Sequence, residues 1–174
     1  MTAPVLITPR LRLRGHAAAD LDATAALWAD ERVVGSITGR PSSREETWAR
    51  LLRYAGLWAV LGFGYWLVED RESNAFVGEV GVADFKRDLE PPLGDALEAG
   101  WVIHPGAQGR GFATEAMLAA LAWVDRHVDA RRAVCMISPD NAASFGVAHK
   151  CGFVEYARTT YKGEPTVLLE RRPA

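Results

Sequence analysis

Apolar and charged residues alternate near the start of the chain. In residues 5–14, Leu11 and Leu13 alternate with three arginines, Arg10, Arg12 and Arg14. A period of two is typical of a half-buried strand, because successive side chains of a strand point to opposite faces. We therefore predict a strand over this range, with its arginines on a solvated face.

The next segments carry helical signals. We predict that a helix begins at Asp20. The apolar face of this helix would consist of residues spaced by four and three: Leu21, Ala25 and Trp28. Residues 31–40 are rich in Gly, Ser and Thr, which predicts a loop. Ser43 and Glu46 have the spacing of a capping box and predict a second helix. This helix would end between positions 56 and 64 and carry Trp48, Leu51 and Leu52.

Strands and two further helices are predicted in the rest of the chain. Runs of apolar and aromatic residues predict strands at 63–69, 75–85 and 96–104. A helical stripe predicts a long helix that carries Met117, Leu121, Val124 and Val128. A buried strand is expected at 133–137, a short helix between Asn141 and Gly152, and a closing strand pair at 153–161 and 166–171.

Composition and charge narrow the class of protein. Of the 174 residues, 49% are hydrophobic and 24% are charged, which suits one soluble domain over residues 1–174. Twenty basic and 22 acidic residues give a net charge of −2, so bulk electrostatics predict binding to neither nucleic acid nor membrane. We see no signal peptide, membrane-spanning run or metal-ligand spacing, and we expect a cytoplasmic protein without a metal.

A glycine-rich run between a predicted strand and the long helix carries the clearest chemistry. It reads Gly106-Ala107-Gln108-Gly109-Arg110-Gly111. The first N–H groups of a helix have no intrahelical partner and attract anions, and glycines let a phosphate approach the backbone. The run lacks the Lys-Ser/Thr of a P-loop, because Phe112-Ala113 stands there, and it lacks the third glycine of a dinucleotide fingerprint. A plain turn without a ligand is the alternative.

The same run resembles a known cofactor motif. Gln108-Gly109-Arg110-Gly111-Phe112-Ala113 fits Gln/Arg-x-x-Gly-x-Gly/Ala, the acetyl-CoA motif of the GCN5-related N-acetyltransferase (GNAT) superfamily. Further segments resemble its RimJ/RimL-like branch, which acetylates ribosomal-protein N-termini: Thr8-Pro9-Arg10-Leu11-Arg12-Leu13-Arg14, Phe76-Val77-Gly78-Glu79-Val80-Gly81, and Asn141-Ala142-Ala143-Ser144 followed by Gly152-Phe153. The resemblance covers residues 8–156. It implies an α/β fold with a mixed, mostly antiparallel sheet of about seven strands, about four helices, and splayed central parallel strands.

The resemblance also implies where acetyl-CoA, the acetyl donor, would bind. Its pyrophosphate would lie on Gln108, Gly109, Arg110, Gly111, Phe112, Ala113 and Thr114. Its pantetheine arm would extend between the strands at 96–104 and 133–137 and pair with backbone groups of Val102 and Ile103, like an added strand. Asn141 would hydrogen-bond the arm.

The resemblance further implies direct attack of an amine on the thioester, and this chemistry needs a base and a proton donor for the thiolate. Glu98 is the candidate base, directly or through water, and its alternative is an ion-paired strand glutamate. Glu79 on the neighbouring strand is the second candidate, and attraction of a cationic amine by the two carboxylates together is the alternative to a base role. Ser144 is the candidate donor to the sulfur. The alternative for Asn141 and Ser144 is helix capping.

The expected function is N-acetyl transfer to a primary amine, which belongs to a protein N-terminus or to a small molecule. The alternative is a non-catalytic acyl-CoA sensor or interaction domain. Members of the family often form dimers, so a homodimer stays open. We expect structural roles for His104 and for the buried thiols of Cys135 and Cys151.

Overall fold

The computed structural model describes residues 2–35, 37–129 and 132–172. The strands in these ranges are β1 (Leu6–Ile7), β2 (Leu11–Arg14), β3 (Tyr65–Asp70), β4 (Phe76–Ala83), β5 (Leu97–Ile103), β6 (Ala133–Ile137), β7 (Val154–Tyr161) and β8 (Glu164–Arg171). The α-helices are α1 (Leu21–Ala29), α2 (Glu31–Val34), α3 (Arg44–Leu61), α4 (Phe112–His127) and α5 (Ala142–Lys150). Two 3-10 turns precede α1 and α4: Ala18–Asp20 and Pro105–Ala107.

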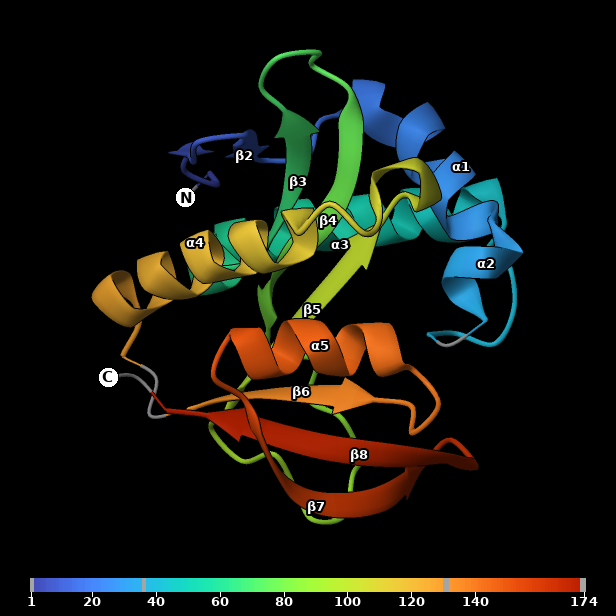
Figure 1. Cartoon of the computed structure of the whole chain (residues 1–174), viewed down its shortest axis with the longest axis vertical. Coiled ribbons are helices and arrows are strands. Elements are labelled where there is room, and N and C mark those ends of the chain that lie inside the picture. Colours follow the sequence, from blue (N-terminus) through green and yellow to red (C-terminus); the bar gives the residue numbers. More distant parts are fainter. Residues whose placement is uncertain (1, 36, 130–131, 173–174) are drawn as a thin grey trace.

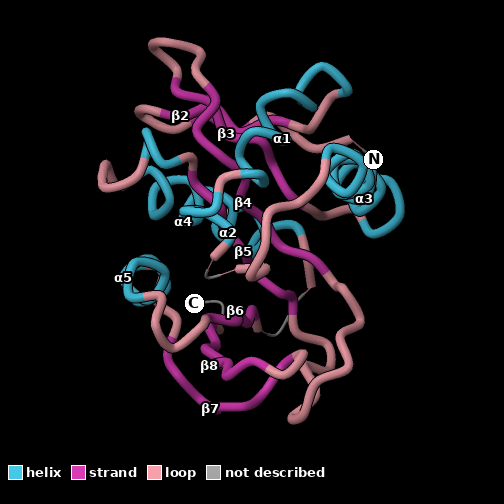
Figure 2. The backbone as a smooth tube through the Cα atoms, turned by 90° about the vertical axis from the view of Figure 1, so that its right-hand side faces the viewer, coloured by secondary structure: helices cyan, strands magenta, loops and turns pink. Residues whose placement is uncertain are grey.

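All eight strands form one sheet in the order β1-β2-β3-β4-β5-β6-β8-β7. The neighbours are antiparallel except for β5 and β6, which are parallel because α4 carries the chain back between them. Helices α4 and α5 cover one face of the sheet, and α3 covers the other with α1 packed against it (Figures 1 and 2). The predicted fold class is confirmed.

The count of elements differs from the prediction at two places. The expected strand over residues 5–14 is two strands, because Pro9 interrupts it and Thr8 binds the Leu11 N–H through its hydroxyl at 2.9 Å. The expected loop over residues 31–40 begins with helix α2. Asp30 caps this helix by accepting a hydrogen bond from the Arg32 backbone N–H at 2.9 Å.

The buried face of α1 also differs from the predicted stripe. Leu27 and Trp28 are buried with Thr24, whereas Leu21 and Ala25 are only half-buried. The reason is local: α2 follows at once, and its Val33 packs with Leu27 and Trp28 in a small cluster. On α3, Leu51 is buried as expected, but Trp48 and Leu52 are exposed.

Several predicted ends of elements are confirmed. Ser43 and Glu46 form a reciprocal capping box at the start of α3, which ends before Gly62 in the left-handed conformation. The β7–β8 hairpin turns through Lys162 and Gly163, both with positive φ, which suits the right-handed twist of paired strands.

The core lies between the sheet and α4. Three indole rings meet edge to face there, with centroid separations of 4.6 to 5.5 Å: Trp58, Trp66 and Trp123. Met117, Leu121 and Val124 of the predicted stripe are buried against the same cluster. No helix in the part of the chain that the structure describes is long and apolar enough to cross a membrane.

Candidate active site

The glycine-rich run lies between the carboxyl end of β5 and the first turn of α4. Gly109 and Gly111 have φ values of 74° and 78°, and Gly111 is the residue before the helix. This conformation favours glycine, and Gly111 brings no side chain to the helix N-terminus. Gly109, Arg110 and Gly111 are exposed, and the Arg10 guanidinium lies over the Phe112 ring beside them. The N–H groups of the first helical turn therefore face an electropositive surface that suits an anion.

Some side chains of this run contact the rest of the protein, and others are exposed to solvent. Gln108 Nε2 donates to the Ile103 carbonyl at 3.0 Å, which ties the loop to β5. Arg110 is exposed and packs its guanidinium over the Phe112 ring at 4.4 Å. Phe112 itself is buried in the core, so only its backbone faces the loop. Ala113 and Thr114 are half-buried in the first turn of α4. Contact of these residues with a cofactor stays a prediction.

Strands β5 and β6 separate after a short paired stretch. Within the described ranges they pair at Leu97 with Ala133 and at Glu98 with Val134, and no further. The His104 N–H donates to the Val77 carbonyl of β4 at 2.8 Å. Alternation along an antiparallel ladder then directs the backbone groups of Val102 toward β4 and those of Ile103 toward the gap. Of the two predicted partners of a pantetheine arm, Ile103 therefore has the suitable orientation, and its carbonyl there already accepts the Gln108 hydrogen bond.

Asn141 and Ser144 lie where the chain leaves β6, at the same sheet edge as the glycine-rich run. Asn141 Oδ1 accepts a hydrogen bond from the Ser144 backbone N–H at 3.0 Å, so Asn141 caps α5. The capping role is observed for this residue. Its amide nitrogen and the Ser144 hydroxyl have no hydrogen-bond partner among the described residues, which leaves their predicted cofactor and acid roles untested.

Glu98, the predicted base, forms an ion pair. Its carboxylate accepts two hydrogen bonds from the Arg87 guanidinium, one from Nε and one from Nη2 at 2.6 Å. Arg87 Nη1 donates to the Tyr161 hydroxyl at 2.9 Å, and the Phe85 and Tyr161 rings flank the guanidinium. Burial works to lower the Arg87 pKa, but the hydrogen bonds to Glu98 and Tyr161 outweigh it and raise that pKa. The ion-paired alternative is observed, while the base role stays a prediction.

A cavity of about 230 Å³ lies beside this ion pair. Glu98 and Arg87 line it together with Phe85, Leu93 and the cross-strand neighbour of Glu98, Ala83. Glu98 lies near the amino end of β5, whereas the glycine-rich run follows its carboxyl end. The cavity and the glycine-rich turn therefore lie at opposite ends of one strand, with the separation of β5 and β6 between them.

Glu79, the second candidate base, is enclosed by side chains. It is 1% exposed, accepts a hydrogen bond from Trp28 Nε1 at 2.8 Å, and lies 3.1 Å from His16 Nε2. The His16 ring has no exposed area, and its Nδ1 atom has no partner among the described residues. This environment supports a structural role for Glu79. The sequence analysis did not identify His16, because an isolated histidine after a strand belongs to no spacing pattern.

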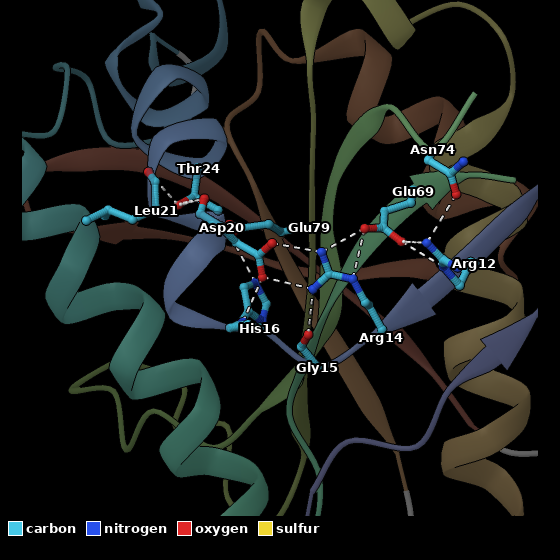
Figure 3. Close-up of polar contacts among 11 residues, drawn as sticks. Arg12, Arg14, Gly15, His16, Asp20, Leu21, Thr24, Glu69, Asn74 and Glu79 are labelled. Atoms are coloured by element: carbon cyan, nitrogen blue, oxygen red, sulfur yellow. Dashed lines mark hydrogen bonds and ion pairs between the residues drawn. The ribbon is translucent and has the colours of Figure 1, made fainter. Parts of the chain in front are cut away.

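Ion pairs fix the arginines of β2, close in sequence to the buried His16. Figure 3 shows Arg12 and Arg14 converging on Glu69, and Arg14 also contacts Asp20 at the turn that follows His16. Arg14 Nη2 lies 2.7 Å from both the Asp20 and the Glu69 carboxylates. Arg12 and Arg14, expected on a solvated face, are therefore fixed by carboxylates of β3 and of the turn before α1.

Tyr65 adds a polar group that the sequence did not single out. A Cβ added to Gly100 of β5 would lie 2.1 Å from the Tyr65 hydroxyl, so this hydroxyl lies directly over the Gly100 backbone. The Tyr54 ring stacks on Tyr65 at 4.4 Å. Burial raises the Tyr65 pKa well above its usual range, which keeps the hydroxyl protonated near the point where β5 and β6 separate.

The remaining candidates have structural surroundings. His104 accepts a hydrogen bond from the Gly106 N–H through Nδ1 at 3.1 Å and so caps the turn before α4. Cys135 and Cys151 are buried, and burial raises the pKa of both thiols, that of Cys151 to about 11. A cluster of three or more His, Cys, Asp or Glu side chains suited to a metal is absent from residues 2–35, 37–129 and 132–172.

A parallel strand pair that separates above a helix N-terminus, within a mostly antiparallel sheet, defines an acyltransferase-type α/β fold. The family described as Acetyltransferase (GNAT) domain matches residues 10–154. The chain belongs to this GNAT family, as the sequence motifs predicted.

Individual relatives agree with this assignment. A putative GnaT-family acetyltransferase from Bordetella pertussis is 33% identical, with a TM-score of 0.84 over 97% of this chain and 99% of that one. The uncharacterized protein YkkB of Bacillus subtilis (strain 168) is 28% identical over 112 residues, which span 64% of this chain and 62% of YkkB, less than two thirds of its length. The ribosomal L7/L12 α-N-protein acetyltransferase RimL in complex with coenzyme A is 20% identical, with a TM-score of 0.80 over 97% of this chain and 98% of RimL, and it shares the fold.

Proposed function

We propose that the chain is an acetyl-CoA-dependent N-acetyltransferase that moves an acetyl group directly to a primary amine. One observation carries the proposal: β5 and β6 separate after Glu98, and the exposed turn at the N-terminus of α4 lies beyond the carboxyl end of β5. Membership of the GNAT family and the coenzyme A complex of the structural neighbour RimL support it.

The residues present suit the donor. The backbone from Gln108 to Thr114 would hold the pyrophosphate, because Gly109 and Gly111 open the approach to the first N–H groups of α4. Ile103 and the Asn141 amide would bind the pantetheine arm. When bound, acetyl-CoA supplies the acetyl group as a reactive thioester.

The chain's own residues would then manage protons. A lysine-like amine, with a pKa of about 10.4, is mostly protonated at neutral pH, so one proton must leave before the nitrogen can attack. Glu98 would accept that proton, directly or through water. As the C–N bond forms and the C–S bond breaks, the second amine proton goes to the leaving thiolate, and Ser144 would donate a hydrogen bond to the sulfur. The products are the N-acetylated amine and free CoA thiol.

The acceptor is a primary amine of a protein N-terminus or of a small molecule. The neighbour RimL is described as an α-N-protein acetyltransferase of ribosomal L7/L12, so the acceptor of that neighbour is a protein. Fold alone does not transfer an acceptor. The cavity of about 230 Å³ beside Glu98 supports the small-molecule alternative.

One observation favours a second candidate function, a non-catalytic acyl-CoA sensor. Both oxygens of the carboxylate proposed as base already accept hydrogen bonds from Arg87, so an incoming amine would have to displace the guanidinium to reach them. A sensor would bind acetyl-CoA without acetylating any amine.

Replacement of the proposed base separates the two functions. In the enzyme, Glu98→Gln is expected to lower kcat by about 10²–10⁴ while acetyl-CoA affinity is retained. The measurement is release of free CoA thiol with a panel of amines, alongside calorimetric titration of acetyl-CoA. Glu155→Gln, which removes a carboxylate from an exposed ion pair on β7, is the matched control and should leave kcat unchanged. Binding by the wild-type protein without turnover of any amine would favour the sensor.

A further inference from the structure

The cavity beside β5 has a pair of opposite charges in its wall. Glu98 and Arg87 both line it, and their side chains are 10% and 24% exposed. Two hydrogen bonds join them, and the third contact of Arg87 is the Tyr161 hydroxyl of β7. The pair is thus mostly withdrawn from solvent but reaches the cavity with both of its charges.

The ion pair between Glu98 and Arg87 has different consequences for an amine alone and for an amine that carries an anion. An ammonium group that approached Glu98 alone would have to displace Arg87, and the guanidinium would then lie partly buried without a counter-charge. Breaking a buried pair in this way is strongly unfavourable. A ligand that carries an anion beside its amine avoids the problem, since its anion can bind Arg87 in the bidentate geometry that the guanidinium prefers.

We infer that the acceptor is a primary amine with a carboxylate a few bonds away, and that this carboxylate recruits Arg87 and releases Glu98 to act on the amine. The inference rests on the proposed function and specifies its substrate class. One ion pair within the protein is exchanged for two with the ligand, so no charge in the cavity wall loses its partner.

The remaining lining agrees with this class. Lys86 and Asp84 form a second pair of opposite charges at the cavity, with Nζ and Oδ2 separated by 2.6 Å. The four charged groups sum to zero, which suits a zwitterion better than a bare cation. A volume of about 230 Å³ is below the roughly 300–1,000 Å³ of sites for drug-sized ligands and fits a ligand of amino-acid size.

The same chemistry has two sources, a free amino acid and an acidic residue at a peptide N-terminus. The experiment therefore compares carboxylate and amide partners of each: alanine with alaninamide, γ-aminobutyrate with its amide, and aspartyl-alaninamide with asparaginyl-alaninamide. Values of kcat/KM are divided by the measured fraction of neutral amine, so that only the added anion differs. The wild-type enzyme should prefer the carboxylate partner by on the order of tenfold or more in at least one pair.

Arg87→Gln provides the decisive variant, because the two partners should respond in opposite directions. The carboxylate partner loses its binding group and slows, while the amide partner gains access to Glu98 and does not slow. If Arg87→Gln folds poorly, Arg87→Lys takes its place. It keeps a positive charge but loses the bidentate guanidinium, so its ratio of kcat/KM for the carboxylate partner to kcat/KM for the amide partner should be intermediate. Arg158→Gln removes an arginine from an exposed ion pair on β7, outside the lining of the cavity, and should retain the carboxylate preference.

Equal rates for carboxylate and amide partners in the wild-type enzyme would overturn the inference and leave the proposed function standing. A parallel loss with both partners in Arg87→Gln would overturn it as well, because a purely structural arginine acts in that way. Calorimetric titration of the CoA-loaded protein with the same partners separates the remaining case. Carboxylate-selective binding that requires Arg87, without turnover, would support this binding site and refute the proposed activity.

Discussion

At the scale of single residues, several polar side chains occupy buried positions that no sequence motif predicts. Tyr65 reaches β5 only because position 100 has no Cβ, and Glu79 is enclosed only because Trp28 and His16 converge on it from separate segments. Glu98 was proposed as the base from its strand position and from the family resemblance, whereas its partner Arg87 was not predicted, since it lies in a loop without a repeating pattern. Long-range pairs of this kind depend on the folded arrangement and leave no local spacing in the sequence.

The contact between Tyr65 and Gly100 leads to a stability prediction. Gly100→Ala should lower the free energy of unfolding by about 1–3 kcal/mol, because the added methyl overlaps the Tyr65 hydroxyl in a packed region. Tyr65→Phe removes the overlapping oxygen, so the double variant should recover part of the loss. Urea unfolding of the two single variants and the double variant measures this coupling. Additive losses would show that the two groups do not meet.

At the scale of elements, the sequence predicted those with strong local signals. The stripe of α4, the capping box of α3 and the strand β6 all appear, because periodicity and capping act within a few residues. Helix α2 was missed because four residues are too few for a helical period, and its buried valines depend on packing against α1. The separation of β5 and β6 came from family resemblance, since strand pairing is a non-local property.

The turn between β5 and α4 gives a prediction at this scale. Gly111→Ala places a side chain at φ 78° at the start of α4 and should weaken acetyl-CoA binding at least about tenfold, through backbone strain at the anion-binding N–H groups. Gly152→Ala is the matched control, since Gly152 has a similar φ of 83° but follows the carboxyl end of α5, away from the proposed phosphate site. Both variants should lose similar stability, but only Gly111→Ala should lose affinity in calorimetric titration. Equal affinities would show that the turn holds no phosphate.

At the scale of the whole molecule, ion pairs join the first strands to the rest of the fold. Glu115 of α4 binds Thr8 and Arg10, Glu69 of β3 binds Arg12 and Arg14, and together they hold the β1–β2 hairpin on the sheet. Burial alone would raise the Glu69 pKa, but hydrogen bonds from Arg14 and Arg12 outweigh it and hold the pKa below its ordinary value of 4.5.

This depressed pKa determines the sign of a pH effect. Glu69 binds its proton less readily in the folded state than in the unfolded state, so its contribution to stability is complete above pH 4.5 and is lost as the pH falls through the folded-state value. Urea unfolding between pH 3 and pH 7 should show stability decreasing below about pH 4.5. Glu69→Gln should be less stable at pH 7 and show a shallower decrease. A decrease as steep as that of the wild type would assign the effect to other carboxylates.

The central claim is that the gap between β5 and β6, with the N-terminus of α4, binds acetyl-CoA. Calorimetric titration of the purified protein with acetyl-CoA, and separately with Mg-ATP, tests it most directly. We expect saturable binding of one acetyl-CoA per chain. We expect no binding of Mg-ATP, because the turn lacks the lysine that a P-loop site for a nucleoside triphosphate requires. If acetyl-CoA does not bind, the turn at Gly109 and Gly111 is only a connection, and the proposed activity is contradicted.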